Sequence, residues 1–308
     1  PDGYHNLRTV FERISLSDTI TLKEIGTPEI KIISDSKEIP CDRRNLAYKA
    51  AEILKEDLGI EKGLEIRIKK IIPVGAGLGG GSSNAASVLL GLNRLWRLGL
   101  SRRRLLGYAA RLGSDVSFFI YDCPYALGTS RGEKIRPLKS WKKRLWHILV
   151  VPGINAPTKE IYQEFDKERA LNFKAGTRLA ALASQRSPLG ARLSALASRR
   201  SPLGEAEGSR GKPREAEGSR GKPRADPGVC SDIKAMLFNR LEEAAFRRYP
   251  QVREVKEILL KEAGLENALM SGSGSAVFGL VDSRKEGLRI AKGFSRFKDW
   301  KVFVVKTK

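Results

Sequence analysis

The amino-acid sequence predicts an α+β fold, because segments with strand periodicity and segments with helix periodicity occur in one chain of 308 residues. Residues 64–72 (LEIRIKKII) mostly alternate apolar with charged side chains, which is typical of a half-buried strand. Residues 46–58 place alanine and leucine at helical spacing, between a capping Asn45 and a terminating Gly59. With 41% hydrophobic residues, the chain can form one large or two medium-sized domains.

Further strands are expected near the N-terminus. Residues 7–22 contain two short alternating stretches with a turn at Asp18 between them, and residues 29–33 form a third. The strand over 64–72 comes later and ends at Pro73.

A glycine-rich loop follows Pro73 and leads into a predicted helix. Ser82, Ser83 and Asn84 are residues of the kind that cap a helix start, and they precede a helix-forming run over 85–92. A loop of bare backbone amides that ends at a helix N-terminus binds anions, because its free N–H groups and the positive end of the helix dipole point at the ligand. The glycines of this loop are Gly75, Gly77, Gly79, Gly80 and Gly81.

The charge around this loop also favours an anionic ligand. Residues 67–114 contain nine Lys or Arg residues and no Asp or Glu. The alternative is a flexible glycine turn beside a solvated basic helix. Because strand, loop, cap and helix occur in the order that a phosphate site needs, we favour a phosphate-binding loop.

Two common types of phosphate loop do not fit this segment. A Walker A loop needs a lysine near its end, and no lysine lies between Lys70 and Lys134. Gly75, Gly77 and Gly80 satisfy the dinucleotide-binding pattern, but that fold also needs an acidic residue about 20 positions later. After the loop, the first acidic residue is Asp115, which lies too far along the chain.

Residues 73–86 (PVGAGLGGGSSNAA) resemble the nucleotide loop of the GHMP kinases, which include galactokinase and the homoserine, mevalonate and phosphomevalonate kinases. Three glycines followed by Ser-Ser are typical of the members that phosphorylate the 2-hydroxyl of a cytidine-diphosphate-linked methylerythritol, in the non-mevalonate isoprenoid pathway. The resemblance implies a two-domain α+β fold. A domain like domain 2 of ribosomal protein S5 is expected over 1–152, and a ferredoxin-like domain over 153–308.

The resemblance also implies the cofactors and the residues that hold them. ATP and Mg²⁺ are expected, with Ser83 near the metal ion through the phosphates. A second glycine-serine turn, over 271–275, is similar to the family motif that closes over the phosphates, although an ordinary hairpin turn is the simpler interpretation. The residues expected to bind ATP are Pro73, Gly75, Gly77, Leu78, Gly79, Gly80, Gly81, Ser82, Ser83, Gly272, Ser273 and Gly274.

A catalytic base is implied by a second match. Residues 113–119 (GSDVSFF) are similar to the family sequence Gly-Ala-Asp-Val-Pro-Phe-Phe, in which the Asp takes the proton from the acceptor hydroxyl. The resemblance therefore assigns this role to Asp115. From the residues alone, an Asp after a helix-ending glycine is more often a turn residue that satisfies nearby amides. A single positioned carboxylate suits phosphoryl transfer, which depends mainly on orientation and charge neutralisation.

Three residues match the family positions that contact the cytosine of the acceptor. They are Tyr4, His5 and Tyr162. Without the resemblance, ordinary packing would explain them equally well. Another small-alcohol kinase of the same fold would not need these contacts, so they discriminate between the two functions.

The remainder of the chain alternates between helices and strands, with a domain boundary expected at Pro152-Gly153. Ser101 is expected to cap the helix over residues 102–112. The expected helices cover residues 102–112, 158–165, 232–248, 251–263 and 286–294. The expected strands cover residues 125–128, 145–151, 276–281 and 301–305, with 268–270 leading into the glycine-serine turn.

Residues 173–228 differ in character from the rest of the chain. Residues 178–190 recur as 192–204 with few changes, and 205–214 recur unchanged as 215–224. These periods are too short for a solenoid, and the second repeat has no large apolar side chain to bury. We expect a disordered low-complexity insert.

The strong positive charge does not by itself identify a partner. The net charge is +22, and the insert contributes +7 of it, from twelve Lys or Arg and five Asp or Glu residues. A basic RNA-binding module is the alternative from another functional class, but aromatic residues do not alternate with the arginines. That alternative predicts RNA affinity that persists after deletion of 173–228.

Cysteine, histidine and the start of the chain add smaller constraints. Three isolated cysteines and two histidines favour neither a disulfide framework nor a zinc site, so a reducing, cytoplasmic compartment is expected, without a membrane span. The chain starts with a Pro-Asp-Gly turn signal and no initiator Met, so we expect a cut N-terminus. The family carries a lysine on a strand upstream, and we expect feeble turnover without it. The oligomeric state is not readable from the sequence.

Overall fold

The structure is a computed structural model that describes residues 7–130, 132–139, 143–167 and 238–308. One unit comprises residues 1–162 and 238–308, and a second comprises 163–237. Within the second unit, the described residues are helical, and Lys167 Nζ lies 3.6 Å from Glu164 Oε2. The predicted insert lies outside the described residues, as do Tyr4 and His5. In the part of the chain that is described, no helix has the length and apolar character needed to cross a bilayer.

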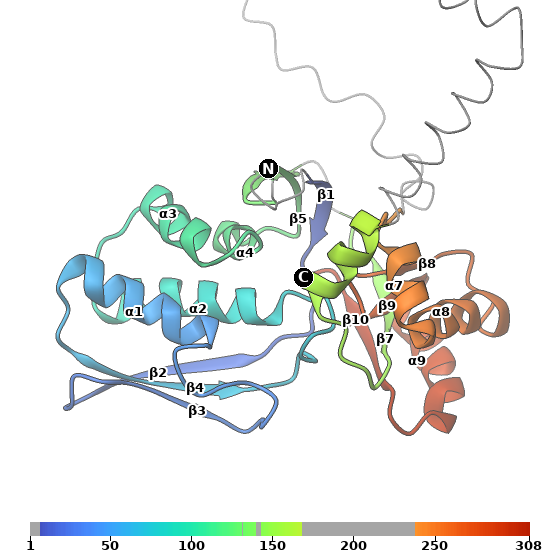
Figure 1. The fold of residues 1–308 in the computed structure, drawn as a ribbon, viewed down its shortest axis with the longest axis horizontal. Coiled ribbons are helices and arrows are strands. Elements are labelled where there is room, and N and C mark those ends of the chain that lie inside the picture. Colours follow the sequence, from blue (N-terminus) through green and yellow to red (C-terminus); the bar gives the residue numbers. More distant parts are fainter. Residues whose placement is uncertain (1–6, 131, 140–142, 168–237) are drawn as a thin grey trace, which may run out of the picture. The chain divides into compact units, whose positions relative to one another are not determined.

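A mixed three-stranded sheet with the order β2-β4-β3 supports the first helices (Figure 1). β2 (Thr19–Ile25) is antiparallel to β4 (Gly63–Lys69), and β3 (Ile30–Ser34) is parallel to β4. A parallel pair needs a crossover connection, and α1 (Leu46–Leu58) supplies it. α1 and α2 (Gly80–Leu95) cover the same face of this sheet.

Local capping explains why two helices have the predicted bounds. The Asn45 side chain accepts a hydrogen bond from the backbone N–H of Ala47 at 2.9 Å, and Gly59 ends α1 with a φ of 62°. Ser101 accepts a hydrogen bond from the N–H of Arg104 at the start of α3 (Arg102–Leu112). Both caps satisfy backbone groups that the helix leaves unpaired, so the predictions for these helices are confirmed.

A second, antiparallel sheet has the order β1-β5-β6. Its strands are β1 (Leu7–Glu12), β5 (Tyr125–Ser130) and β6 (Lys134–Pro137). The sequence analysis did not predict β6, which is only four residues long. The short helix α4 (Val116–Tyr121) precedes β5 and packs against α2 and α3.

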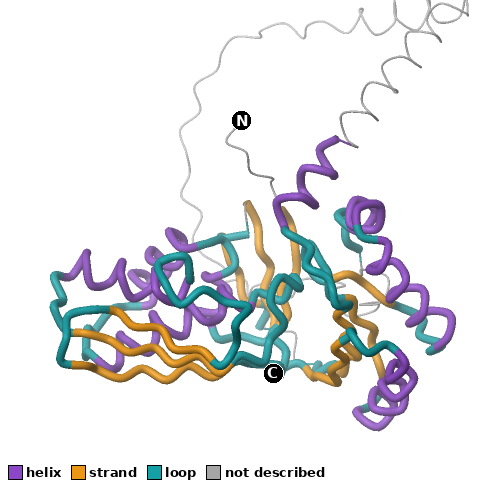
Figure 2. The backbone as a smooth tube through the Cα atoms, turned by 60° about the horizontal axis from the view of Figure 1, so that its bottom comes forward, coloured by secondary structure: helices purple, strands orange, loops and turns teal. Residues whose placement is uncertain are grey.

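The third sheet is antiparallel and has the order β10-β7-β9-β8. Figure 2 shows the strands of all sheets in orange. When the four strands of the third sheet are numbered by their order in the chain, they lie in the sheet in the order 4-1-3-2. Helices follow the first and the third of these strands. This is the ferredoxin-like arrangement. The strands are β7 (Trp146–Val151), β8 (Ala268–Met270), β9 (Val277–Val281) and β10 (Lys301–Lys306). The later helical segments are α7 (Glu242–Arg248), α8 (Pro250–Glu257), the π-helical η2 (Ile258–Glu262), α9 (Arg284–Gly293) and the 3-10 helix η3 (Phe294–Arg296).

The arrangement of β7 corrects the predicted domain boundary. A boundary at 152 places β7 with the first domain, yet β7 hydrogen-bonds to β9 and β10 of the third sheet. Sheet membership therefore places the boundary before Trp146. The apolar pattern of 145–151 indicates a buried strand, but it contains no information about which strands pair with it.

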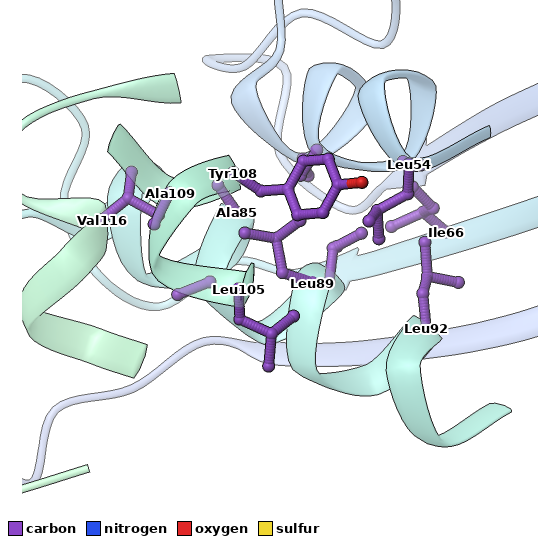
Figure 3. Packing of buried hydrophobic residues seen from close by; sticks show 14 of the residues in the cluster. Leu54, Ile66, Ala85, Leu89, Leu92, Leu105, Tyr108, Ala109 and Val116 are labelled. Carbon is purple, nitrogen blue, oxygen red and sulfur yellow. The ribbon is translucent and has the colours of Figure 1, made fainter. Parts of the chain in front are cut away.

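The core of the first unit lies between the β2-β4-β3 sheet and the helices above it (Figure 3). Leu54 from α1, Ile66 from β4 and Leu89 from α2 are all fully buried. Leu105 and Tyr108 from α3 close the cluster from the other side of α2. This packing holds α2, and hence the loop that precedes it, on the sheet.

We predict that Leu89→Ala lowers the free energy of unfolding by about 2–5 kcal/mol, because it leaves a cavity in this cluster. Leu95→Ala on the same helix is the control. Leu95 is 40% exposed, so its truncation should cost less than about 1 kcal/mol. Urea unfolding followed by circular dichroism measures both values, and equal losses would show that Leu89 does not belong to the core.

Candidate active site

The glycine-rich loop joins β4 to α2 and needs glycine at two positions in particular. Gly77 and Gly79 have φ values of 69° and 65°, in the left-handed region that side chains disfavour. A Cβ on Gly77 would lie 2.3 Å from the carbonyl oxygen of Ser271, and a Cβ on Gly79 would lie 3.3 Å from the ring of Phe119. The loop backbone therefore packs directly against two other parts of the unit.

Helix α2 begins earlier than the sequence predicted. The N-cap is Gly79, and Ser82, Ser83 and Asn84 lie within the helix, so the prediction that they form the cap is wrong. The N–H of Ser83 makes the first helical bond, to the Gly79 carbonyl at 2.8 Å. The left-handed Gly79 turns the chain into the helix before the serines are reached.

This start leaves three amides available to a ligand. The N–H groups of Gly80, Gly81 and Ser82 precede the first helical bond, so they have no acceptor within the helix. Free amides at a helix N-terminus, together with the helix dipole, favour phosphate oxygens. The anion site at this helix start stays a prediction, with the N–H groups of Gly80–Ser82 as its expected donors.

The second glycine-serine turn lies between β8 and β9 and contacts the first. Ser271 Oγ donates a hydrogen bond to the Gly77 carbonyl at 2.9 Å, and the Ala276 N–H donates to the Ala76 carbonyl at 3.2 Å. A Cβ on Gly272 would lie 3.1 Å from the Gly77 oxygen. Two turns that are 194 positions apart in the sequence therefore meet at Gly77.

Side chains from the C-terminal half hold the second turn in place. Asn239 Nδ2 donates to the carbonyls of Met270 and Gly272 at 2.9 and 2.7 Å. Thr158 Oγ1 and Ser273 Oγ lie 2.8 Å apart. These supporting residues were not predicted from the sequence, although an Asn ahead of a helix is a typical signal for side-chain bonds to the backbone.

Asn239 also corrects a predicted helix. The sequence predicted one helix over 232–248, but the described residues become helical only at Glu242. The side-chain oxygen Oδ1 of Asn239 accepts a hydrogen bond from the N–H of Leu241 at 2.9 Å, which favours a turn over a continuous helix here. Glu242 then binds the Met270 N–H through Oε1 and Lys256 through Oε2, at 2.8 and 2.6 Å.

Asp115 is the residue immediately before α4 and makes no side-chain capping bond to that helix. Asp115 thus lies in a turn, as the simpler interpretation expects, but its carboxylate does not satisfy the amides of α4. The Asp115 side chain is exposed to solvent, but protein atoms surround it on the other sides. Partial loss of hydration by these surroundings raises the pKa of its carboxyl. α4 packs on α2, and a Cβ on Gly79 would lie 3.3 Å from the ring of Phe119, so the helix that follows Asp115 lies against the start of α2.

Tyr162 lies close to Asp115. Burial raises the pKa of the Tyr162 hydroxyl, and the negative charge of Asp115 raises it further. Tyr162 therefore lies within range of the Asp115 charge, and its contact with the cytosine stays a prediction. The other two predicted cytosine contacts lie outside the described residues.

Comparisons with known proteins agree with this geometry. The family descriptions that match are "GHMP kinases N terminal domain" over residues 45–123 and "GHMP kinases C terminal" over residues 230–298. The 4-diphosphocytidyl-2-C-methyl-D-erythritol kinase of Geobacillus kaustophilus is 37% identical, and the match covers 99% of this chain and 90% of the relative. The kinase of the same name from a Geobacter species is 36% identical, with 100% and 92% covered.

The chain belongs to the 4-diphosphocytidyl-2-C-methyl-D-erythritol kinase family of GHMP kinases. A crystal structure of a 4-(cytidine 5'-diphospho)-2C-methyl-D-erythritol kinase matches it with a TM-score of 0.66 and 29% identity, over 99% of this chain and 91% of that structure. The resemblance that the glycine loop suggested is thus confirmed for the family and the fold. The roles of the individual site residues in this family member stay predictions.

We predict that Gly77→Ala lowers kcat/KM for ATP by about a hundredfold, because the new Cβ collides with the Ser271 carbonyl and separates the two turns. Gly107→Ala is the control. A Cβ on Gly107 meets nothing within 4 Å, so this variant should keep wild-type kinetics. Steady-state assays of ADP release measure both, and wild-type kinetics in Gly77→Ala would contradict the contact.

Proposed function

We propose that this chain transfers the γ-phosphoryl group of ATP to the 2-hydroxyl of 4-diphosphocytidyl-2-C-methyl-D-erythritol, a step of the non-mevalonate isoprenoid pathway. The names of its relatives support the substrate. The observation that carries the proposal is the contact of the two glycine turns beside the open amides of α2. Such an arrangement suits a triphosphate, because it offers hydrogen-bond donors and no side chain that would collide with the phosphates.

The amides of Gly80, Gly81 and Ser82 would bind the phosphate oxygens, with Gly272 to Gly274 facing them. Asp115 would accept the proton of the acceptor hydroxyl as its oxygen attacks the γ-phosphorus. The new oxygen–phosphorus bond forms while the bond to the β-phosphate oxygen breaks, and ADP leaves. The stretch over 67–114, which lacks acidic residues, would reduce repulsion of the triphosphate.

Mg²⁺ is part of this proposal, and the donor set fits an ion that arrives with ATP. Among the described residues, no three His, Cys, Asp or Glu side chains form a cluster that could hold a metal ion by themselves. Ser83 Oγ donates to the Gly80 carbonyl at 2.8 Å, which leaves its oxygen lone pairs for a hard cation. Mg²⁺ would neutralise phosphate charge, with Ser83 and the phosphates as its ligands.

We predict that Asp115→Asn lowers kcat by about 10²–10⁴-fold, because the proton acceptor is lost. The same variant should not lower the thermal unfolding midpoint at neutral pH. Burial raises the folded-state pKa of this carboxyl, so its ionised form disfavours folding, and stability is lost as the pH rises through that pKa. A large loss of stability with retained activity would reverse this assignment.

The pH dependence of the wild-type enzyme provides a separate check. Asp115 must be ionised to accept a proton, so kcat should fall as the pH decreases through its pKa. Burial places that pKa above 3.8, and the acidic limb of the profile should lie correspondingly higher. The limb should disappear in Asp115→Asn.

We predict that Tyr162→Ala raises the KM for the cytidylyl acceptor about tenfold or more and leaves the KM for ATP within about twofold. An aromatic ring that stacks on cytosine contributes to binding of the acceptor only. The measurement varies each substrate in turn at saturating levels of the other. An unchanged acceptor KM would favour another small-alcohol kinase of this fold.

A further inference from the structure

The chain between the end of β4 and the glycine loop is held by side chains instead of by a neighbouring strand. β4 ends at Lys69, and the next three backbone N–H groups all bind carboxylates. The Lys70 N–H donates to Asp35 Oδ1 at 2.8 Å. The N–H groups of Ile71 and Ile72 donate to Asp18 Oδ1 at 2.7 and 2.8 Å. Asp18 immediately precedes β2 and Asp35 immediately follows β3, so both flanking strands of the sheet contribute an acceptor.

The second oxygen of Asp18 forms a buried ion pair. Lys70 Nζ lies 2.8 Å from Asp18 Oδ2, and the two side chains are 6% and 1% exposed. Lys70 Nζ also donates to the Ile72 carbonyl. Burying two charges is costly unless hydrogen bonds also satisfy their other donor and acceptor positions. Here both oxygens of the Asp18 carboxylate accept hydrogen bonds.

This ion pair lies against the start of α2. A Cβ on Gly80 would be 3.3 Å from Lys70 Nζ and 3.0 Å from the Ile72 side chain. Gly80 is the first residue of the helix and carries one of the amides open to phosphate. Lys70 thus lies against the residue that begins α2, and Asp18 acts on it through its ion pair with Lys70.

We propose that Asp18 and Lys70 are positioning residues for the nucleotide loop. The carboxylate fixes the backbone at Ile71 and Ile72, and the ammonium fixes both the carboxylate and the Ile72 carbonyl. The direction in which the chain enters the loop is thereby set before any ligand binds. The inference rests on the proposed role of this loop in binding ATP, and it adds two residues that do not contact the phosphates themselves.

Two charge-matched double variants test this role. Asp18→Ala with Lys70→Met removes the acceptor for both amides, without leaving a buried unpaired charge. Asp18→Asn with Lys70→Met has the same charge and keeps an amide oxygen as acceptor. We expect the first variant to raise the KM for ATP roughly tenfold or more. The second should stay within about threefold of the wild type, as a rescue by the conservative side chain.

The acceptor substrate and Asp35 serve as controls. A positioning role at the nucleotide loop leaves the KM for the acceptor unchanged, whereas general loosening of the fold raises both KM values. Asp35→Ala should keep wild-type kinetics, because Asp35 is exposed and water can replace its bond to the Lys70 N–H.

A wild-type KM for ATP in the alanine variant, or equal rises in both KM values, overturns the proposal. If that variant does not fold, hydrogen exchange in the wild type decides. The Ile71 and Ile72 amides should then exchange as slowly as those of β4 without nucleotide, and exchange at the rate of a solvent-exposed loop overturns the proposal. Failure of the function itself is distinct, because the wild type would then not phosphorylate the cytidylyl acceptor at all.

Discussion

The contact between two glycine-containing turns is the constraint on which the site depends. Ser271 Oγ binds the Gly77 carbonyl, and the space between these backbones leaves no room for a Cβ at Gly77. Because the first turn precedes α2 and the second joins β8 to β9, this contact fixes the start of α2 to the third sheet. A polyphosphate bound at α2, as proposed, would be positioned by both turns.

The electrostatics of the site follow from the same geometry. Three amides at the start of α2 provide partial positive charge without the desolvation cost of a buried cation. The buried cation that does lie nearby, Lys70, is already paired with Asp18. Lys70 therefore orders the loop, whereas the three amides of α2 are left to bind a ligand. Asp115 is exposed to solvent, which suits the role of proton acceptor proposed for it.

The stability of the site comes from elements on either side of it. The core under α1, α2 and α3 anchors the helix that starts at Gly80. On the other side, Asn239 and Glu242 bind the backbone around Met270, and Lys256 pairs with Glu242. The loops add a small apolar cluster of their own, in which Ala76 and Ala276 are buried beside Leu149 and Val151. Rigid supports with backbone loops between them allow a ligand to be held by main-chain groups, which vary little in position.

The sequence by itself determined the family, the type of phosphate loop, and those helices whose ends are set by neighbouring residues, such as the one between Asn45 and Gly59. Capping bonds join residues only a few positions apart, so they can be recognised locally. Only the tertiary structure decided that α2 begins at Gly79–Gly80, that β7 belongs to the third sheet, and that Asp18 pairs with Lys70. In a basic, alternating strand, Lys70 looks like any solvated lysine. Its burial depends on residues 52 positions away, and no local pattern records such a contact.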